Sequence, residues 1–155
     1  MNLKILWPGR TRNCDIKKIQ DDLFKKIGRL DRCDLIETKE ARGIDEKNEN
    51  QIMEIEAKGL EKYFGNDYIV CLSDKGKELS SKEFARFLSK MTSHSTRTVT
   101  FVVGGFLGLD KRIIHRADFL LSLSKMTFSH ELIRLILLEQ IYRSLTIMKG
   151  HQYAK

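Results

Sequence analysis

The most informative stretch of this sequence is TVTFVVGGFLGLD, residues 98–110. Its first half, residues 98–103, is rich in β-branched and apolar residues, which favours a short buried strand. The strand pattern stops at Gly104 and Gly105, and Gly108 follows three residues later. Because glycine has no Cβ, two adjacent glycines let the backbone approach a neighbouring group closely. The stretch therefore predicts a strand that ends against a ligand, a phosphate or another helix.

Alternation of apolar strands and amphipathic helices continues outward from this stretch over the rest of the chain. The apolar runs predict strands at residues 2–7, 34–38, 67–73, 98–103 and 118–124. Apolar residues at helical spacing predict helices at 13–29, after Asn48, after Ser80, at 110–117 and at 130–148. This order predicts an α/β fold, a mostly parallel sheet with helices on both faces, in a single domain over residues 1–155.

Three of the predicted helices have recognisable start signals. Asn13 is a residue type that caps helices by accepting hydrogen bonds from the first turn. Asn48 with Gln51 resembles a capping pair, and Ser80 with Glu83 has the spacing of a capping box.

Composition indicates an ordinary globular protein. The chain has 155 residues, of which 41% are hydrophobic and 32% charged, and no apolar run approaches the roughly 20 residues that span a bilayer. The N-terminal residues 1–10 are broken too early by Pro8 to act as a signal peptide, so we expect a cytoplasmic protein. Its three cysteines and four histidines are scattered, which predicts neither disulfides nor a metal site.

The charge is unevenly distributed along the chain. The net charge is +7, and residues 10–32 hold eight Lys/Arg against four Asp. Residues 37–56 hold seven Asp/Glu against three Lys/Arg. These charges fit solvated helix faces, and the basic segment equally fits a surface that binds RNA.

The last predicted helix has two apolar stripes where one would cover a sheet. The first contains Ile133, Ile136, Leu137, Ile141 and Leu145, and the second contains Leu132, Leu135, Leu138 and Tyr142. Two explanations stay open: a helix buried on all sides within one chain, or a second stripe that packs on a partner subunit. Glu139 and Arg143 have the spacing of a helical ion pair.

The glycines do not form a known phosphate cradle. The turn after the first strand reads PGRTRN rather than a dinucleotide fingerprint, and no Gly-Lys-Ser/Thr is present. The glycines instead follow the fourth strand, at the edge where open α/β sheets bind ligands. Considered by themselves, these glycines fit a tight turn between a strand and a helix. Together with the small residues after the third and fifth strands, they predict a pocket of backbone groups suited to an adenine and a ribose.

Four linked motifs resemble one enzyme family. They are the turn GGFLGL, the loop LSLSKMTFSH with an arginine four residues after its histidine, the run EQIYR, and a tail with Tyr153. The pattern is similar, over essentially the whole chain, to the ribosomal RNA large-subunit methyltransferase H family of SPOUT enzymes. The resemblance implies a C-terminal trefoil knot and a homodimer in which one subunit closes the other's pocket. It also implies S-adenosylmethionine-dependent methylation of N3 of a pseudouridine in helix 69 of 23S rRNA, on the assembled ribosome.

The resemblance also implies site residues. S-adenosylmethionine would contact Leu72, Gly104, Leu123, Ser124, Lys125, Met126, Thr127 and Phe128. The missing Cβ of Gly104 would then admit the cofactor. The target base must lose its N3 proton before it can attack, and the candidates to hold or deprotonate it are His130, Arg134, Glu139, Tyr142, Arg143 and Tyr153. A helix N-terminus would lower the pKa of His130, which suits a neutral base, although His130 equally fits a simple neighbour of the cap.

Two departures from the family pattern bear on activity. Phe106-Leu107 stands where many relatives carry Pro-Glu, and Ala154 follows Tyr153 where relatives usually have histidine. The alternative function is therefore a catalytically impaired ribosome- or RNA-binding module of the same fold. A nucleotide-binding regulatory domain is disfavoured, because the phosphate loop is missing.

Overall fold

The computed structural model describes residues 2–94 and 97–152, without the side chains of 92–94. Ten elements alternate along the chain: β1 (Asn2–Pro8), α1 (Cys14–Leu30), β2 (Arg32–Thr38), α2 (Glu49–Glu61), β3 (Tyr68–Glu78), α3 (Ser81–His94), β4 (Val99–Val102), α4 (Lys111–Arg116), β5 (Phe119–Ser122) and α5 (His130–Met148). The strands form one sheet in the order β2-β1-β4-β3-β5, and each neighbouring pair is parallel. The predicted α/β class and parallel sheet are confirmed.

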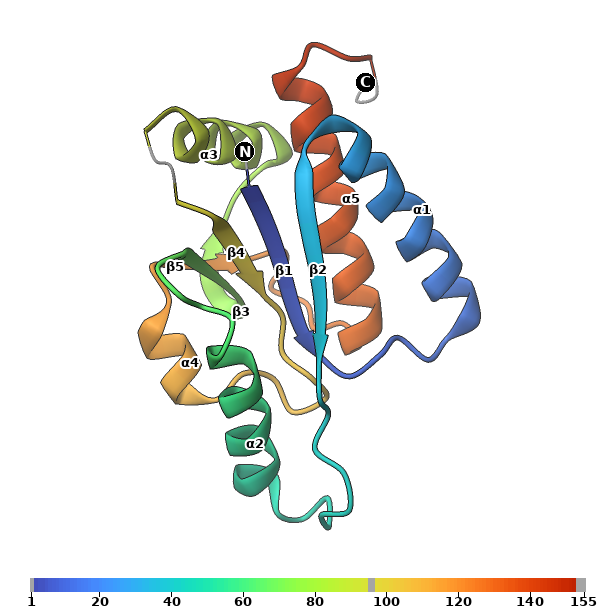
Figure 1. The fold of residues 1–155 in the computed structure, drawn as a ribbon, viewed down its shortest axis with the longest axis vertical. Coiled ribbons are helices and arrows are strands. Elements are labelled where there is room, and N and C mark those ends of the chain that lie inside the picture. Colours follow the sequence, from blue (N-terminus) through green and yellow to red (C-terminus); the bar gives the residue numbers. More distant parts are fainter. Residues whose placement is uncertain (1, 95–96, 153–155) are drawn as a thin grey trace.

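Helices cover both faces of the sheet, as the alternating strand side chains require. Leu3, Ile5 and Trp7 of β1 point to the face covered by α1, α3 and α5, and Leu6 points to the face of α2 and α4. Figure 1 shows α1 and α5 side by side, with β2 in front of part of α5. The predicted arrangement of helices on both faces is therefore confirmed.

Two of the three predicted helix caps are present. The Asn13 side chain accepts hydrogen bonds from the first turn of α1. Ser80 and Glu83 exchange the reciprocal bonds of a capping box, with the Ser80 N–H donating to Glu83 at 2.7 Å. The prediction for Asn48 is wrong, because its side chain makes no cap hydrogen bond. Its backbone, at φ −90° and ψ 54°, lies outside the extended conformation that capping needs.

β3 is longer than the sequence pattern predicts, and its extension shapes one edge of the sheet. Its pairing with β5 shifts register between Leu72 and Lys77, so residues 73–76 bulge out of the ladder. A Cβ on Gly76 would lie 2.7 Å from the carbonyl carbons of Leu120 and Leu121. Glycine at this position thus lets the chain return against β5 after the bulge.

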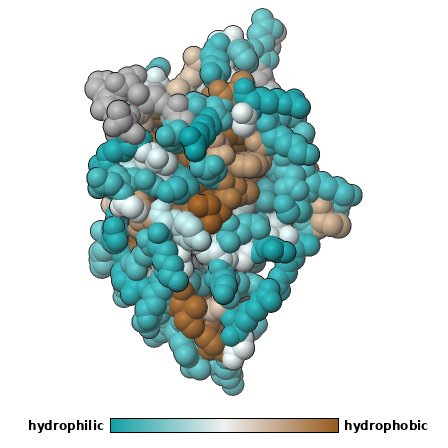
Figure 2. All heavy atoms as spheres, viewed as in Figure 1, coloured by the Kyte–Doolittle hydropathy of each residue, from teal (hydrophilic) through white to brown (hydrophobic). Residues whose placement is uncertain are grey.

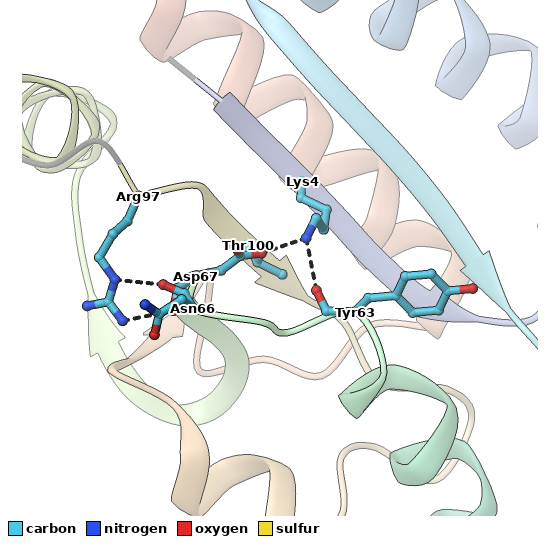
Figure 3. A network of polar contacts seen from close by, with 6 residues as sticks. All are labelled: Lys4, Tyr63, Asn66, Asp67, Arg97 and Thr100. Atoms are coloured by element: carbon cyan, nitrogen blue, oxygen red, sulfur yellow. Dashed lines mark hydrogen bonds and ion pairs between the residues drawn. The ribbon is translucent and has the colours of Figure 1, made fainter.

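A polar network ties the turn after α2 to the interior strands β1 and β4 (Figure 3). The Lys4 ammonium donates to the Tyr63 carbonyl at 2.9 Å and to the Asp67 carboxylate at 2.6 Å. The Thr100 hydroxyl donates to the same carboxylate oxygen at 2.6 Å. Because the side chain of Asp67 is only 14% exposed, these bonds are shielded from water.

Replacing Asp67 with alanine is expected to lower the free energy of unfolding by about 2 kcal/mol, because the Lys4 ammonium and the Thr100 hydroxyl lose their acceptor. Urea denaturation measures the change. Asp22→Ala is the matched control, since Asp22 pairs with Lys26 at an exposed helical site where such pairs are worth about 0.5 kcal/mol. Equal losses in the two variants would contradict this role.

Within the described residues, no helix combines the length and the apolar character that crossing a bilayer requires. On the face shown in Figure 2, hydrophilic residues predominate, and apolar residues gather in two areas, over α2 and over the middle of β1 and β2. All three cysteines are free, and no group of three or more His, Cys, Asp or Glu in the described residues could hold a metal ion.

Candidate active site

A large cavity lies where three strands end. It has a volume of about 690 Å³ and is lined by the bulge after Leu72, by residues 103–109 after β4, by residues 123, 124 and 126–128 after β5, and by parts of α4 and the start of α5. Since all five strands are parallel, these segments meet at the carboxyl edge of the sheet, as predicted. The volume falls within the range of small-molecule sites.

The glycine turn after β4 is packed against itself. A Cβ on Gly104 would lie 2.5 Å from the carbonyl carbon of Gly108 and 2.8 Å from its Cα. Gly108 has φ +83°, a left-handed conformation that side chains disfavour, and its N–H donates to the Gly105 carbonyl at 3.1 Å. The backbone of the same turn therefore fills the space that a Cβ on Gly104 would occupy. This differs from the expectation that the missing Cβ leaves room for a ligand. Contact between Gly104 and the cofactor stays a prediction.

The segment after β5 is held by two serines. The Ser122 hydroxyl donates to the Ser124 carbonyl at 3.0 Å, and the Ser124 hydroxyl accepts from the Met126 N–H at 2.9 Å. Seven of the eight predicted cofactor residues line the cavity: Leu72, Gly104, Leu123, Ser124, Met126, Thr127 and Phe128. Lys125 is outside the lining, because its side chain is 84% exposed and reaches toward Glu78 at 3.8 Å.

Among the predicted catalytic candidates that the structure describes, His130 is the one that lines this cavity. It is the first residue of α5, after Ser129, whose side chain caps the helix by accepting from the Leu132 N–H. Burial lowers the pKa of His130 below its ordinary value, and the nearby Arg134 lowers it further. The imidazole is therefore neutral at physiological pH and able to accept a proton.

Glu131 connects the start of α5 to the loop after β1 through hydrogen bonds. Its carboxylate accepts from the backbone N–H of Arg12 at 2.5 Å and of Asn13 at 3.2 Å. The Arg12 guanidinium also donates to Glu40 at 2.7 Å. Sequence reasoning did not select Glu131, because a glutamate in the first turn of a helix is common on helical grounds alone.

Arg134 is a buried cation beside this loop rather than a cavity residue. It is 1% exposed, and its guanidinium lies 5.0 Å from the ring centre of Trp7. It donates to the carbonyls of Pro8 at 2.6 Å and Gly9 at 3.3 Å. Burial lowers its pKa to about 10, so the side chain stays charged at neutral pH. These contacts fit a residue that positions the start of α5, and a direct part in chemistry stays a prediction.

Replacing Arg134 with methionine is expected to lower the free energy of unfolding by about 3 kcal/mol. The change keeps an apolar stem beside Trp7 but leaves two buried carbonyls without their donor. Urea denaturation tests this against Arg29→Met, at an exposed site near the end of α1, where the expected change is below about 0.5 kcal/mol. A loss as small as that of Arg29→Met would show that the buried contacts contribute little.

The remaining catalytic candidates lie elsewhere. The predicted Glu139–Arg143 ion pair is confirmed, with 2.7 Å between Arg143 Nη2 and Glu139 Oε1. Arg143 lines a second cavity of about 630 Å³ between α3 and α5, and Tyr142 is half-buried against the core. Thirteen residues at a helical rise of 1.5 Å place Arg143 about 20 Å along α5 from His130. Tyr153 lies outside the described residues. Among the described residues, one chain therefore does not bring Glu139, Tyr142 and Arg143 to the large cavity.

The apolar stripes of α5 are largely accounted for within one chain. Leu138 is fully buried, and Leu135 and Tyr142 pack against the same core. Leu132, at 37% exposure, is the member of the second stripe that faces outward. This favours the explanation that α5 is buried between the sheet, α1 and α3, and the homodimer stays a prediction.

Several cavity residues were missed by sequence reasoning. They are Lys75 from the bulge of β3, Phe106 from the glycine turn, and Lys111 and His115 from α4. The bulge could not be foreseen, because nothing in the alternation of residues 73–77 predicts that the strand resumes. Phe106 had a signal in the sequence, since a large apolar residue between two glycine positions is exposed by a tight turn.

A family model and full-length relatives match almost the whole chain. Residues 1–154 match the family model described as "Predicted SPOUT methyltransferase". The chain is 36% identical over 159 residues to ribosomal RNA large subunit methyltransferase H of Clostridium perfringens, and 35% identical to that of Limosilactobacillus reuteri, with both chains fully covered in each case.

Solved structures share the fold at low sequence identity. A probable methylase family protein from Haemophilus influenzae superimposes with a TM-score of 0.55 and 10% identity, over 99% of this chain and 70% of that one. The tRNA (m1G37) methyltransferase of Aquifex aeolicus gives a TM-score of 0.52 and 14% identity, over 92% and 70% of the two chains. At these identities the likeness concerns the fold alone.

Proposed function

Because this chain belongs to the SPOUT methyltransferase family, we propose that it methylates N3 of a pseudouridine in helix 69 of 23S rRNA, with S-adenosylmethionine as donor. Full-length relatives named as methyltransferases of large-subunit ribosomal RNA support the substrate class. The observation that carries the proposal is the cavity at the ends of β3, β4 and β5, which holds a neutral His130 beside the predicted cofactor residues.

The cavity suits the methyl donor in size and in lining. Apolar side chains such as Leu72 and Leu123 offer a surface for an adenine, and the serine-braced segment 122–126 offers hydroxyl and backbone groups for a ribose. The residues that would hold the cofactor are Leu72, Gly104, Leu123, Ser124, Met126, Thr127 and Phe128, with Lys125 outside the cavity. When bound, S-adenosylmethionine supplies an electrophilic methyl group on a sulfonium centre.

His130 is the group of this chain best placed to remove the N3 proton. An imide nitrogen is a poor nucleophile until it is deprotonated, and a neutral imidazole at the cavity wall can accept that proton. Burial keeps the imidazole neutral, and Glu131 and Arg134 hold the first turn of α5 against the loop after β1. The remaining contribution of the protein is to align the target base with the methyl group.

A second copy of the chain would complete the site. Tyr142 and Arg143 lie too far along α5 to reach the cavity of their own subunit, so we assign them to the cavity of a partner in a homodimer. The basic surface, with exposed Arg10, Arg12 and Lys18, would then bind the phosphates of the ribosomal RNA. A ribosomal substrate places the reaction in the cytoplasm. The trefoil knot that the resemblance implies stays a prediction.

The direct test is methylation of ribosomal RNA by the purified protein. Assembled ribosomes, free large subunits and naked 23S rRNA are each incubated with S-adenosylmethionine, and nuclease fragments are analysed by mass spectrometry. We expect one added methyl group on the helix 69 pseudouridine, with assembled ribosomes as the best substrate. Binding of S-adenosylmethionine and ribosomes without methylation would instead support the impaired binding module, which the residue Ala154 favours.

A further inference from the structure

Phe106 is the most exposed large apolar side chain in the described part of the protein, at 81%. It lies at the tip of the glycine turn after β4, which the bridge between Gly105 and Gly108 and the close packing of Gly104 hold in shape. A benzyl ring held in water by a tight turn gains free energy when a second apolar surface covers it. The turn thus presents a fixed, uncovered aromatic face at the rim of the large cavity.

The exposed ring is not an isolated case on the surface. Met126, at 75% exposure, and Phe128, at 39%, line the same cavity from the segment after β5. Single exposed apolar side chains are normal on proteins, but a group of them around one cavity marks a binding surface. The two most exposed large apolar residues in the described chain are therefore both placed at the cavity.

The charge around these residues points to a polyanion. Lys75 and Lys111 line the cavity, and neither forms an ion pair within the described residues. Asp74 is the single carboxylate in the described lining. Two available ammonium groups beside exposed apolar surface match a ligand that has flat bases and negative phosphates.

We propose that the ring of Phe106 stacks on an unpaired base of the substrate RNA while Lys75 and Lys111 contact its phosphates. This role rests on the proposed rRNA methylation. An enzyme that modifies the ring edge of a base must act on a base that is unpaired, and proteins hold such bases on aromatic faces. The side chain of Met126 lines the same cavity, in which Leu72 and Leu123 would hold the methyl donor.

The first test compares substitutions at Phe106 under steady-state turnover with assembled ribosomes. Phe106→Leu keeps an apolar side chain without an aromatic face, and Phe106→Tyr keeps the face. We expect the KM for ribosomes to rise by about tenfold in Phe106→Leu, the effect of losing one stacked base, and to stay within about twofold in Phe106→Tyr. The dissociation constant for S-adenosylmethionine and the oligomeric state are expected to stay unchanged in both.

The second test observes stacking directly by fluorescence. The chain has one tryptophan, Trp7, which is fully buried, so Phe106→Trp adds a reporter at the rim. We expect an RNA stem-loop with the helix 69 sequence to quench this reporter. Ile55→Trp, on α2, is the control, because Ile55 is 39% exposed and lies outside the cavity lining. Quenching in the control alone, or in neither variant, would overturn the proposal.

The outcomes separate this inference from the proposed function. If the unmodified protein does not methylate ribosomal RNA, the proposed function fails before any variant is compared. If it does, and Phe106→Leu has an unchanged KM, the stacking role is wrong while the function stands. Weaker binding of S-adenosylmethionine in Phe106→Leu would assign the ring to the cofactor instead. A shift from dimer to monomer would assign it to a second copy of the chain, and either result would overturn the inference.

Discussion

Replacing His130 with glutamine is expected to slow methyl transfer by about 100- to 10,000-fold, the range that a lost general base produces. Glutamine has a similar length and can still form hydrogen bonds, but its amide does not take up a proton near neutral pH. Single-turnover assays with labelled S-adenosylmethionine and ribosomes measure the rate of the chemical step. The affinity for S-adenosylmethionine is expected to change little, since the proposed cofactor contacts lie in the segments after the strands.

The pH dependence gives an independent check on His130. Burial lowers its pKa below the ordinary value of 6.5, and only the neutral form above that pKa accepts a proton. The single-turnover rate should therefore fall as the pH drops through the lowered pKa, and this acid limb should disappear in His130→Gln. Rates measured between about pH 5 and pH 8 cover the transition. An acid limb that persists in the variant would assign the proton acceptor to another group.

Replacing Gly104 with alanine is expected to weaken S-adenosylmethionine binding by about 10- to 100-fold. The new Cβ would lie 2.5 Å from a backbone carbon of Gly108, so the turn of residues 104–108 must move. Forcing extra atoms into packed structure costs about 1–3 kcal/mol, which corresponds to this loss if the displaced turn no longer forms the cavity wall. Isothermal titration calorimetry with S-adenosylmethionine measures the loss.

Gly28 provides the matched control for this substitution. It lies in α1, and a Cβ built there meets no atom within 4 Å. Gly28→Ala is therefore expected to bind S-adenosylmethionine normally and to gain about 0.5–1 kcal/mol of stability from better helix propensity. Gly104→Ala should keep its far-UV circular dichroism spectrum, because the clash is confined to a surface turn. Normal binding by Gly104→Ala would mean that the turn does not contribute to the cofactor site.

The fold could be predicted largely from local sequence patterns, and the errors of that prediction have local causes. The five strands and five helices follow from apolar periodicity, because each element buries one face or stripe in a core that the other elements share. The end of β3 could not be predicted, since residues 73–77 are polar and their return to the sheet depends on Gly76 packing against β5. The cap at Asn48 failed because capping requires a backbone conformation that residue type does not determine.

The candidate site was predictable where residues follow a strand and less so where they lie on a helix. Leu72, Gly104 and Leu123 could be placed together, because parallel strands bring their carboxyl ends to one edge. Arg134 and Arg143 share α5 with His130. Helix geometry nevertheless places Arg134 against the ring of Trp7, and Arg143 about 20 Å along the helix from His130. The glycines around the rim residue Phe106 mark it in the sequence, but its 81% exposure depends on how the glycine turn folds.

Binding of S-adenosylmethionine in the cavity at the ends of β3, β4 and β5 underlies both the proposed methylation and the proposed RNA contact. Two-dimensional amide NMR spectra of the isotope-labelled protein, recorded during titration with S-adenosylmethionine, locate the site residue by residue. We predict saturable shifts confined to residues 72–75, 103–109 and 123–130. Shifts centred on Ala85 and Ile147, in the cavity between α3 and α5, or no saturable shifts at all, would contradict cofactor binding at the ends of these strands.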